Sequence, residues 1–261
     1  MGLKILLSSI FYKNNVQPFN IKLIKMEESN YQDGAYIPFV GEEPLEARRS
    51  FIEKTYTFLA IEVLVFILVT AVFIRIEPLV QLTLTLFGGW WVLLFLMGYM
   101  AVLNFAENWA MSTTSKPSQY AAMGLYIIAE AFFFTPLLFI AKEYAGVSVI
   151  NQAAMVTVAM FLGITAIAFT SKRDYSHLRN YLMLGGSVAL GLIFAGVLFG
   201  FSLGIWFAFG MVALASVAIL YQTSNILHKY HTGQHVAASL GLFGSVMLLF
   251  WYVLNIFMSG D

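Results

Sequence analysis

Seven long apolar segments divide this chain, and each is long enough to cross a lipid bilayer. Each holds about 20 residues, the number that a helix needs to span about 30 Å of hydrocarbon. Backbone groups in hydrocarbon must be satisfied within the segment, and alternating ten-residue strands typical of membrane barrels are missing from the pattern. We therefore predict an all-α, polytopic membrane protein. The expected spans are Tyr56–Ile74, Leu84–Phe105, Tyr120–Ala141, Ile150–Thr170, Tyr181–Phe201, Gly204–Tyr221 and Val236–Met258.

The composition supports a bilayer as the main solvent. Of the 261 residues, 60% are hydrophobic and 11% are charged, whereas a soluble domain carries about 25% charged residues. The mean hydropathy is +0.80. The formal net charge is zero, which gives no electrostatic reason to expect nucleic acid as a partner. There are no cysteines, so thiol chemistry and disulfides are excluded, and no cofactor is expected.

The positive charges near the spans predict an orientation. Cytoplasmic loops carry an excess of Lys and Arg, and with seven spans the connections alternate between the two sides. One side has eight such residues and the other has only Arg75 and Lys142. We therefore expect the N-terminus in the cytoplasm and the C-terminus outside. The eight are Arg48, Arg49, Lys54, Lys116, Lys172, Arg173, Arg179 and Lys229.

The chain divides into a polar N-terminal tail, residues 1–50, and a seven-helix domain, residues 51–261. The tail's first 25 residues are basic and partly apolar, and the region from Glu27 to Glu53 holds six glutamates. A solvated cytoplasmic segment is the favoured interpretation, with a docking peptide for a partner as the alternative. Whether Met1 or Met26 is the true start stays open.

Small residues in two spans predict close helix packing, because helices in lipid associate where backbones can approach. Gly196 and Gly200 have the small-xxx-small spacing, and Gly185, Gly186 and Gly191 precede them in the fifth span. In the seventh span, Gly241 and Gly244 are expected to have the same role.

Two glutamates lie inside the spans, where an unpaired ionisable group costs several kcal/mol and usually marks function. Glu62 lies in the first span and Glu130 near the centre of the third. We expect both to line one cytoplasm-facing cavity together with the region of Gln222. The alternative is that each carboxyl group is hydrogen-bonded or protonated and only joins helices.

The sequence argues against an enzyme and a metal site. The three aspartates, Asp33, Asp174 and Asp261, lie outside the spans, so an intramembrane aspartyl protease is excluded. Neither an H-E-x-x-H zinc motif nor a G-x-S-x-G nucleophile motif occurs. His228, His231 and His235 precede the seventh span, but Thr232-Gly233 should break a helix there, so we interpret them as a solvated loop.

Four segments, in the expected order, are similar to the Bax inhibitor-1 family. Residues 125–138 (LYIIAEAFFFTPLL) resemble its glutamate-bearing third helix, and residues 169–186 (FTSKRDYSHLRNYLMLGG) its Thr-Lys-x-Asp-Phe-Ser run. Residues 219–227 (ILYQTSNIL) resemble its Leu-Tyr-Asp-Thr signature. Residues 235–254 (HVAASLGLFGSVMLLFWYVL) resemble its seventh helix. The resemblance covers roughly residues 50–258.

The resemblance implies a central seventh helix wrapped by six others. It also implies a calcium-permeable leak gated by protonation of two aspartates, which correspond here to Gln222 and Ser245. Neither residue is a carboxylate, so the family's di-aspartyl pH sensor is expected to be absent.

Bacterial members of the family resemble a modulator of a membrane-anchored AAA protease that binds through a cytoplasmic tail. Two hypotheses follow from the resemblance. The first is a cation leak with Glu62, Glu130, Gln222 and Ser245 along its path. The second is a regulator that binds a membrane protein partner. The resemblance further suggests a bacterial inner membrane, with an internal eukaryotic membrane as the alternative.

Overall fold

The computed structural model describes residues 31–32, 35–171 and 173–259. Two parts of the chain, up to Phe39 and from Val40 onward, form separate compact units. In the first unit, strands β1 (Tyr31–Gln32) and β2 (Ala35–Tyr36) form a short antiparallel pair. The predictions for residues 1–30 fall outside the described residues.

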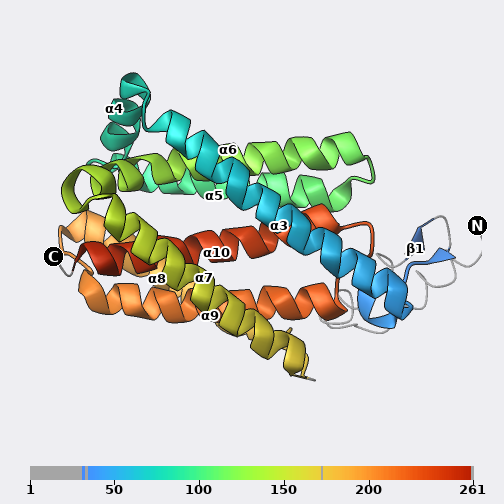
Figure 1. Ribbon diagram of the computed structural model, residues 1–261. Helices are drawn as coiled ribbons and strands as arrows, with labels where there is room; N and C mark the ends of the chain where they lie inside the picture. Colours follow the sequence, from blue (N-terminus) through green and yellow to red (C-terminus); the bar gives the residue numbers. More distant parts are fainter. Residues whose placement is uncertain (1–30, 33–34, 172, 260–261) are drawn as a thin grey trace, which may run out of the picture. The chain divides into compact units, whose positions relative to one another are not determined.

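The second unit is a helical bundle (Figure 1). After a 3-10 turn at Val40–Glu42, its helices are α3 (Leu45–Phe73), α4 (Glu77–Leu86), α5 (Trp91–Ser112), α6 (Lys116–Ile140), α7 (Val147–Thr170), α8 (Leu178–Phe199), α9 (Gly204–His228) and α10 (His235–Met258). A π-helical turn, Ala141–Ala145, continues α6. Among the described residues, seven helices are long and apolar enough to cross a membrane. The prediction of an all-α fold with seven spans is therefore confirmed.

The first two spans were predicted with wrong bounds. Helix α3 begins at Leu45, because good helix formers extend it ahead of the apolar run. The second apolar segment was expected at Leu84–Phe105, but α4 occupies its beginning and α5 starts only at Trp91. Gly88 and Gly89 interrupt the chain between the two helices, and Gly89 has a φ of 57°, which favours glycine.

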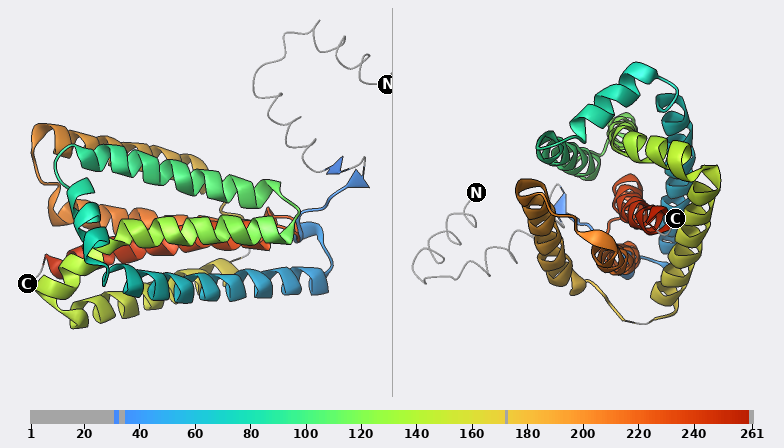
Figure 2. Two further views of the ribbon diagram at one scale, coloured as in Figure 1. Left: turned by 90° about the horizontal axis from the view of Figure 1, so that it is seen from above. Right: turned by 90° about the vertical axis from the view of Figure 1, so that its left-hand side faces the viewer.

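Helix α10 lies at the centre of the bundle, as the family resemblance implied. Viewed along the bundle, it is surrounded by the other helices (Figure 2). It packs against α3, α5, α6, α7 and α9. Its buried residues face several directions around the helix, and half of its most apolar stretch is buried, compared with 11–44% in the other six spans. The outer spans also carry large exposed apolar side chains, which suit a lipid environment.

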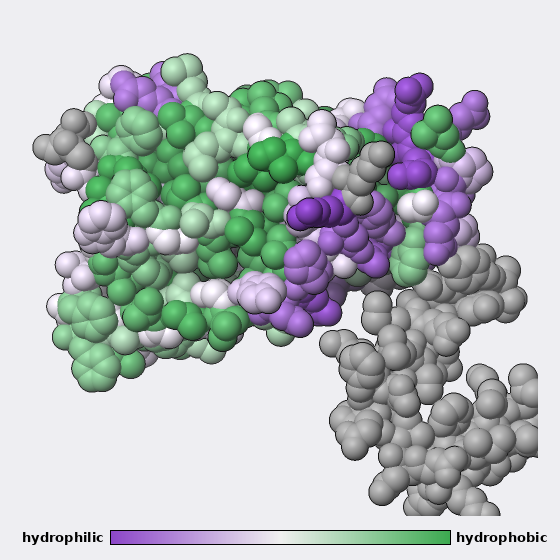
Figure 3. Space-filling model, turned by 90° about the horizontal axis from the view of Figure 1, so that it is seen from below, coloured by the Kyte–Doolittle hydropathy of each residue, from purple (hydrophilic) through white to green (hydrophobic). Residues whose placement is uncertain are grey.

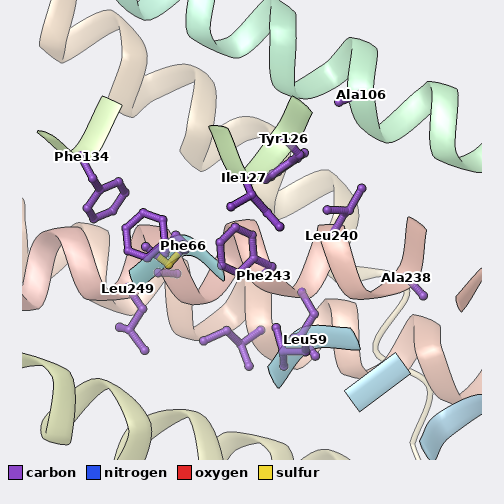
Figure 4. Close-up of a cluster of buried hydrophobic side chains, with 14 of the residues drawn as sticks. Leu59, Phe66, Ala106, Tyr126, Ile127, Phe134, Ala238, Leu240, Phe243 and Leu249 are labelled. Carbon is purple, nitrogen blue, oxygen red and sulfur yellow. The ribbon is translucent and has the colours of Figure 1, made fainter. Parts of the chain in front are cut away.

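Aromatic rings fill the contact between α3, α6 and α10 (Figure 4). Phe66 of α3 packs edge-on against Phe134 of α6, with ring centroids 5.3 Å apart. It also meets Phe243 of α10 at 6.1 Å. Phe243 in turn contacts Tyr126 of α6 at 6.0 Å. These rings hold the central helix in register with two neighbours.

Hydrophilic side chains gather at the end of the bundle where α3 begins, and apolar side chains cover most of the remaining visible face, apart from a small hydrophilic patch at the opposite end (Figure 3). We call this region the polar end. It contains the start of α3, the α5–α6 and α7–α8 connections and the α9–α10 loop. The basic residues assigned to the cytoplasmic side belong to these segments, except that Lys172 is not described.

Two local predictions need correction. The Gly196–Gly200 pair was expected to pack helices together, but Gly200 ends α8 with a φ of 73°, and its N–H donates to the carbonyl oxygen of Gly196. The pair therefore forms a helix end, where a left-handed residue is favoured. The loop predicted to hold three histidines is also shorter than expected. Helix α9 includes His228 as its last residue, and α10 begins at His235.

Candidate functional site

Glu62 is buried between α3 and α10 and meets one hydroxyl group. Its side chain is fully buried, and its Oε1 lies 2.6 Å from the Oγ of Ser239. The same Oγ lies 2.8 Å from the carbonyl oxygen of Val236. A serine hydroxyl has one proton to donate, so both contacts are satisfied together when the carboxyl group of Glu62 carries a proton. A neutral carboxyl also avoids the cost of an unpaired buried charge.

Glu130 is buried near the middle of α6. Its side chain is 1% exposed, and Tyr99 of α5 lies near its carboxyl group. Among the described residues, its Oε2 finds no hydrogen-bond partner. A buried polar atom without a partner calls for an explanation such as a ligand, an ion or water.

Gln222 and Ser245 meet at the backbone of Gly241. A Cβ atom at Gly241 would lie 2.9 Å from Nε2 and 3.2 Å from Cδ of Gln222. The carboxamide of Gln222 therefore lies against the bare backbone of α10. Ser245, one helical turn further on, donates its hydroxyl to the carbonyl oxygen of Gly241 at 2.9 Å. The structure thus places at one glycine the two residues that were expected to stand at the positions of the family's aspartates.

Gly244 lacks a side chain, so a side chain from α6 packs directly against the backbone of α10 at this position. A Cβ atom there would collide with the hydroxyl oxygen of Tyr126 and would lie 3.4 Å from its Cζ. Tyr126 belongs to α6 and is buried. The prediction that Gly241 and Gly244 permit close approach is therefore confirmed, although side chains rather than neighbouring backbones fill the space.

These contacts form one layer across the bundle, which we call the central layer: Glu62–Ser239, Gln222–Gly241–Ser245 and Tyr126–Gly244. Its positions on α10 run from Ser239 to Ser245, within about 9 Å along the helix at 1.5 Å per residue. The layer lies in the half of α10 that starts at the polar end.

A cavity of about 740 Å³ begins at this layer and continues away from the polar end. Its walls come from α5, α6, α8, α9 and α10, and the lining runs along α10 from Gly244 to Ser259, the residue after the helix. Glu130, Tyr99 and Tyr126 form the polar part of the wall near its inner end. Most of the remaining lining is aliphatic or aromatic.

The structure separates the two glutamates that were expected to share a cavity. Glu130 lines the cavity just described, whereas Glu62, Gln222 and Ser245 do not. The cavity extends toward the C-terminal end of α10, opposite the polar end. Glu62 is fully buried and contacts Ser239 of α10 instead.

Sequence reasoning missed the partners of the glutamates. Ser239, Tyr99 and Tyr126 had no signal of their own, because a serine or tyrosine in an apolar span is unremarkable until its neighbour is known. No group of three or more metal-binding side chains occurs within the described ranges.

Asp174 also has a role that the motif alone did not reveal. It lies in the α7–α8 connection, outside the spans, and its Oδ2 is 3.4 Å from the Nζ of Lys229. Ser224 of α9 donates to its Oδ1 at 3.3 Å and accepts the N–H of Tyr175 at 2.9 Å. These contacts join the connection to the end of α9.

The pKa of the Asp174 carboxyl reflects two opposed causes. Partial burial raises this pKa, but hydrogen bonds from Ser176 and the positive charge of Lys229 outweigh it, so the pKa lies below its ordinary value. Asp174 is therefore ionised at neutral pH and holds the connection as a charged group.

Comparisons with known proteins find related sequences along most of the chain. The family model described as "Inhibitor of apoptosis-promoting Bax1" matches residues 48–261. Protein LIFEGUARD 4 of Arabidopsis thaliana is 25% identical over 235 residues, which are 86% of this chain and 90% of the relative. Bax inhibitor 1 of Schizosaccharomyces pombe is 26% identical over 220 residues, 83% of this chain and 79% of the relative. An uncharacterized protein of Pseudomonas aeruginosa is 34% identical over 113 residues, 43% of this chain and half of the relative.

Proposed function

Because this chain belongs to the Bax inhibitor-1 family and is an integral membrane protein, we propose that it is a cation leak through which calcium ions pass. The observation that carries the proposal is the cavity of about 740 Å³ with the carboxyl group of Glu130 in its wall. Acidic groups inside a membrane protein that line a cavity commonly mark an ion pathway. The proposed activity is transport and not catalysis.

In this proposal, cations enter the cavity from the end where α10 terminates and reach Glu130. The central layer then separates them from the polar end. Glu62 and Ser239 form one part of this barrier, and Gln222 and Ser245 form another. These contacts join α10 to its neighbours, so passage requires some of them to open.

The proposed leak lacks the family's pH sensor. Two neighbouring carboxyl groups share a proton and titrate as a coupled pair. A carboxamide and a hydroxyl at the corresponding positions, Gln222 and Ser245, do not titrate in the physiological range. We therefore expect the rate of the leak to depend little on pH.

We also propose that the protein resides in a bacterial inner membrane with its polar end in the cytoplasm. The eight basic residues assigned to that side support this orientation. The gathering of hydrophilic side chains at the polar end agrees with it (Figure 3).

Calcium flux into proteoliposomes tests the leak. The purified protein should admit calcium at comparable rates at pH 6 and pH 8. Replacing Glu130 by Gln should lower the flux severalfold, because the carboxylate charge that attracts cations is lost. Glu143→Gln, in an exposed ion pair with Lys142, is the matched control and should leave the flux unchanged. Equal flux in the wild type and Glu130→Gln refutes the assigned pathway.

A second proposal is a regulator that binds a membrane protein, such as a membrane-anchored protease, through its N-terminal tail. The favouring observation is that Val40 is buried and its N–H donates to the carbonyl oxygen of Tyr230 at 2.8 Å. Val40, the first residue of the bundle, is therefore held in place at the polar end. Deleting residues 1–36 keeps this anchor, and it should abolish co-purification of the partner without unfolding the bundle. Retained co-purification would contradict the proposal.

A further inference from the structure

The cavity is bounded on two sides by helices that do not pack on each other. Helix α5 packs against α4, α6 and α10, and α8 packs against α9, but α5 and α8 form no packed pair. They are neighbours around the bundle (Figure 2, right). Both contribute walls to the cavity. The line between α5 and α8 is therefore where the cavity comes nearest to the surrounding lipid.

The walls along this line are apolar. Helix α5 contributes Leu96, Met100 and Leu103, and α8 contributes Ala189 and Ile193. An alkyl chain transferred from lipid to such walls exchanges one apolar environment for another. Entry between the two helices therefore has little opposing cost, and close packing inside the cavity can favour it.

The inner part of the cavity offers hydrogen-bond acceptors and no positive charge. Glu130 has a buried Oε2 without a partner, beside Tyr99 and Tyr126. Among the residues that the structure describes, no Lys, Arg or His lines the cavity. A molecule with a negative head group would meet no compensating charge there, so an anionic lipid is disfavoured.

The depth of Glu130 decides between a hydroxyl and an ammonium group. Glu130 is midway along α6 and its continuation, Lys116–Ala145, so a ligand that enters from the side brings its polar group through the hydrocarbon. An ammonium group at that depth is strongly disfavoured, whereas the smaller cost of burying a hydroxyl is recovered when the hydroxyl forms a hydrogen bond. A neutral alcohol is the amphiphile that fits both the route and the acceptor.

We propose that the cavity binds a neutral lipid alcohol, with a single alkyl or isoprenoid chain, that enters between α5 and α8 and donates its hydroxyl to the carboxyl group of Glu130. The volume of about 740 Å³ lies within the range of about 300–1,000 Å³ found for small-molecule sites. This binding site goes beyond the proposed leak, because binding requires no ion flux.

Quenching of Trp251 fluorescence measures the binding, because Trp251 lines the cavity. The probes are 12-bromododecan-1-ol and, without the hydroxyl, 1-bromododecane, added to the full chain in detergent. The part of the quenching that is lost in Trp251→Phe measures binding of the probe in the cavity. The alcohol should bind about tenfold more tightly than the bromoalkane, because one hydrogen bond to a carboxyl group typically contributes about that much to the affinity.

Two replacements of Glu130 separate this proposal from the leak. Glu130→Gln keeps an acceptor oxygen, so it should retain the preference for the alcohol although it lowers calcium flux. Glu130→Leu removes the acceptor and should reduce the affinity for the alcohol to that for the bromoalkane. An unchanged preference in Glu130→Leu overturns the assigned contact, whatever the flux measurements show.

A filled cavity supplies an independent test. Ala189→Phe places a ring in the wall that α8 contributes, and it should abolish the quenching of Trp251 by both probes. Val188→Phe, at the exposed neighbouring position on the same helix, is the matched control and should bind both probes as the wild type does. Quenching that survives Ala189→Phe in the folded variant overturns the proposed site.

Discussion

A methyl group added at Gly244 would occupy the space that the hydroxyl group of Tyr126 fills. The collision involves the end of a rigid phenol, which cannot bend away as an alkyl chain does. The ring is also held from the side by Phe243, with centroids 6.0 Å apart. Gly244→Ala must therefore shift α6 relative to α10, or turn the ring of Tyr126 out of its place.

The expected cost follows from the packing of this contact. Overpacking a well-packed core by one carbon atom typically costs about 1–3 kcal/mol, and a rigid partner between two helices places Gly244→Ala in the upper half of that range. Alanine is intrinsically better than glycine within a helix by about 1 kcal/mol. We therefore expect a net loss of about 1–2 kcal/mol in the free energy of unfolding.

Removing the hydroxyl of Tyr126 should rescue this variant. With phenylalanine at position 126, the nearest ring atom to the new methyl group is Cζ, at 3.4 Å, which is close to ordinary contact. The double variant Gly244→Ala/Tyr126→Phe should recover most of the loss. The two substitutions should therefore be coupled by about 1–2 kcal/mol in a double-mutant cycle.

Equilibrium unfolding in mixed detergent micelles, followed by far-UV circular dichroism, measures these free energies. Gly163→Ala on α7 is the control, because a Cβ atom there meets nothing within 4 Å, and it should cause no loss of stability. If Gly244→Ala is as stable as the wild type, or if Tyr126→Phe fails to rescue it, the assigned contact is wrong.

Three further predictions concern other contacts of the bundle. Ser239→Ala removes the hydroxyl partner of the buried Glu62 and should cost about 1–3 kcal/mol in the same unfolding assay; an unchanged free energy would contradict that hydrogen bond. Asp174→Asn breaks an ion pair whose side chains are 40% and 47% exposed, so it should cost less than about 1 kcal/mol, and the difference should shrink in high salt. Because the pKa of Asp174 is lowered on folding, its contribution should be complete above its unfolded pKa of about 3.9 and should vanish as the pH falls through the folded value. The melting temperatures of the wild type and of Asp174→Asn should therefore converge in acid. A difference that widens in acid would refute the conclusion that folding lowers the pKa of Asp174.

The spans could be predicted from the sequence because a run of about 20 apolar residues has one main structural solution in a bilayer. Their ends were less certain, since hydropathy does not distinguish a helix end from a break between two helices. Glu77–Leu86 and the chain after it formed one apolar region, which concealed α4. Pro78 in the first turn of α4 and the Gly88-Gly89 pair were available signals for its start and its end.

The candidate site was only partly predictable. Glu62 and Glu130 were identified because an acidic residue within an apolar span is unusual, and both are buried. Their surroundings depend on pairs that are distant in the chain, such as Glu62 and Ser239, which are 177 positions apart. The local sequence pattern gives no information on such pairs. The expectation that both glutamates share one cavity was therefore made without knowledge of their neighbours.

Helix α10 meets three neighbours within a short length, and this limits how the central layer can open. Ser239 contacts Glu62 of α3. Gly241 contacts Gln222 of α9, and Gly244 contacts Tyr126 of α6. At about 100° per residue these positions point in different directions around α10. A shift of α10 along its axis must therefore disturb all three contacts at once. A movement of one neighbouring helix can release its own contact alone. The proposed leak should consequently be gated most easily by α3, α6 or α9, with α10 remaining in place.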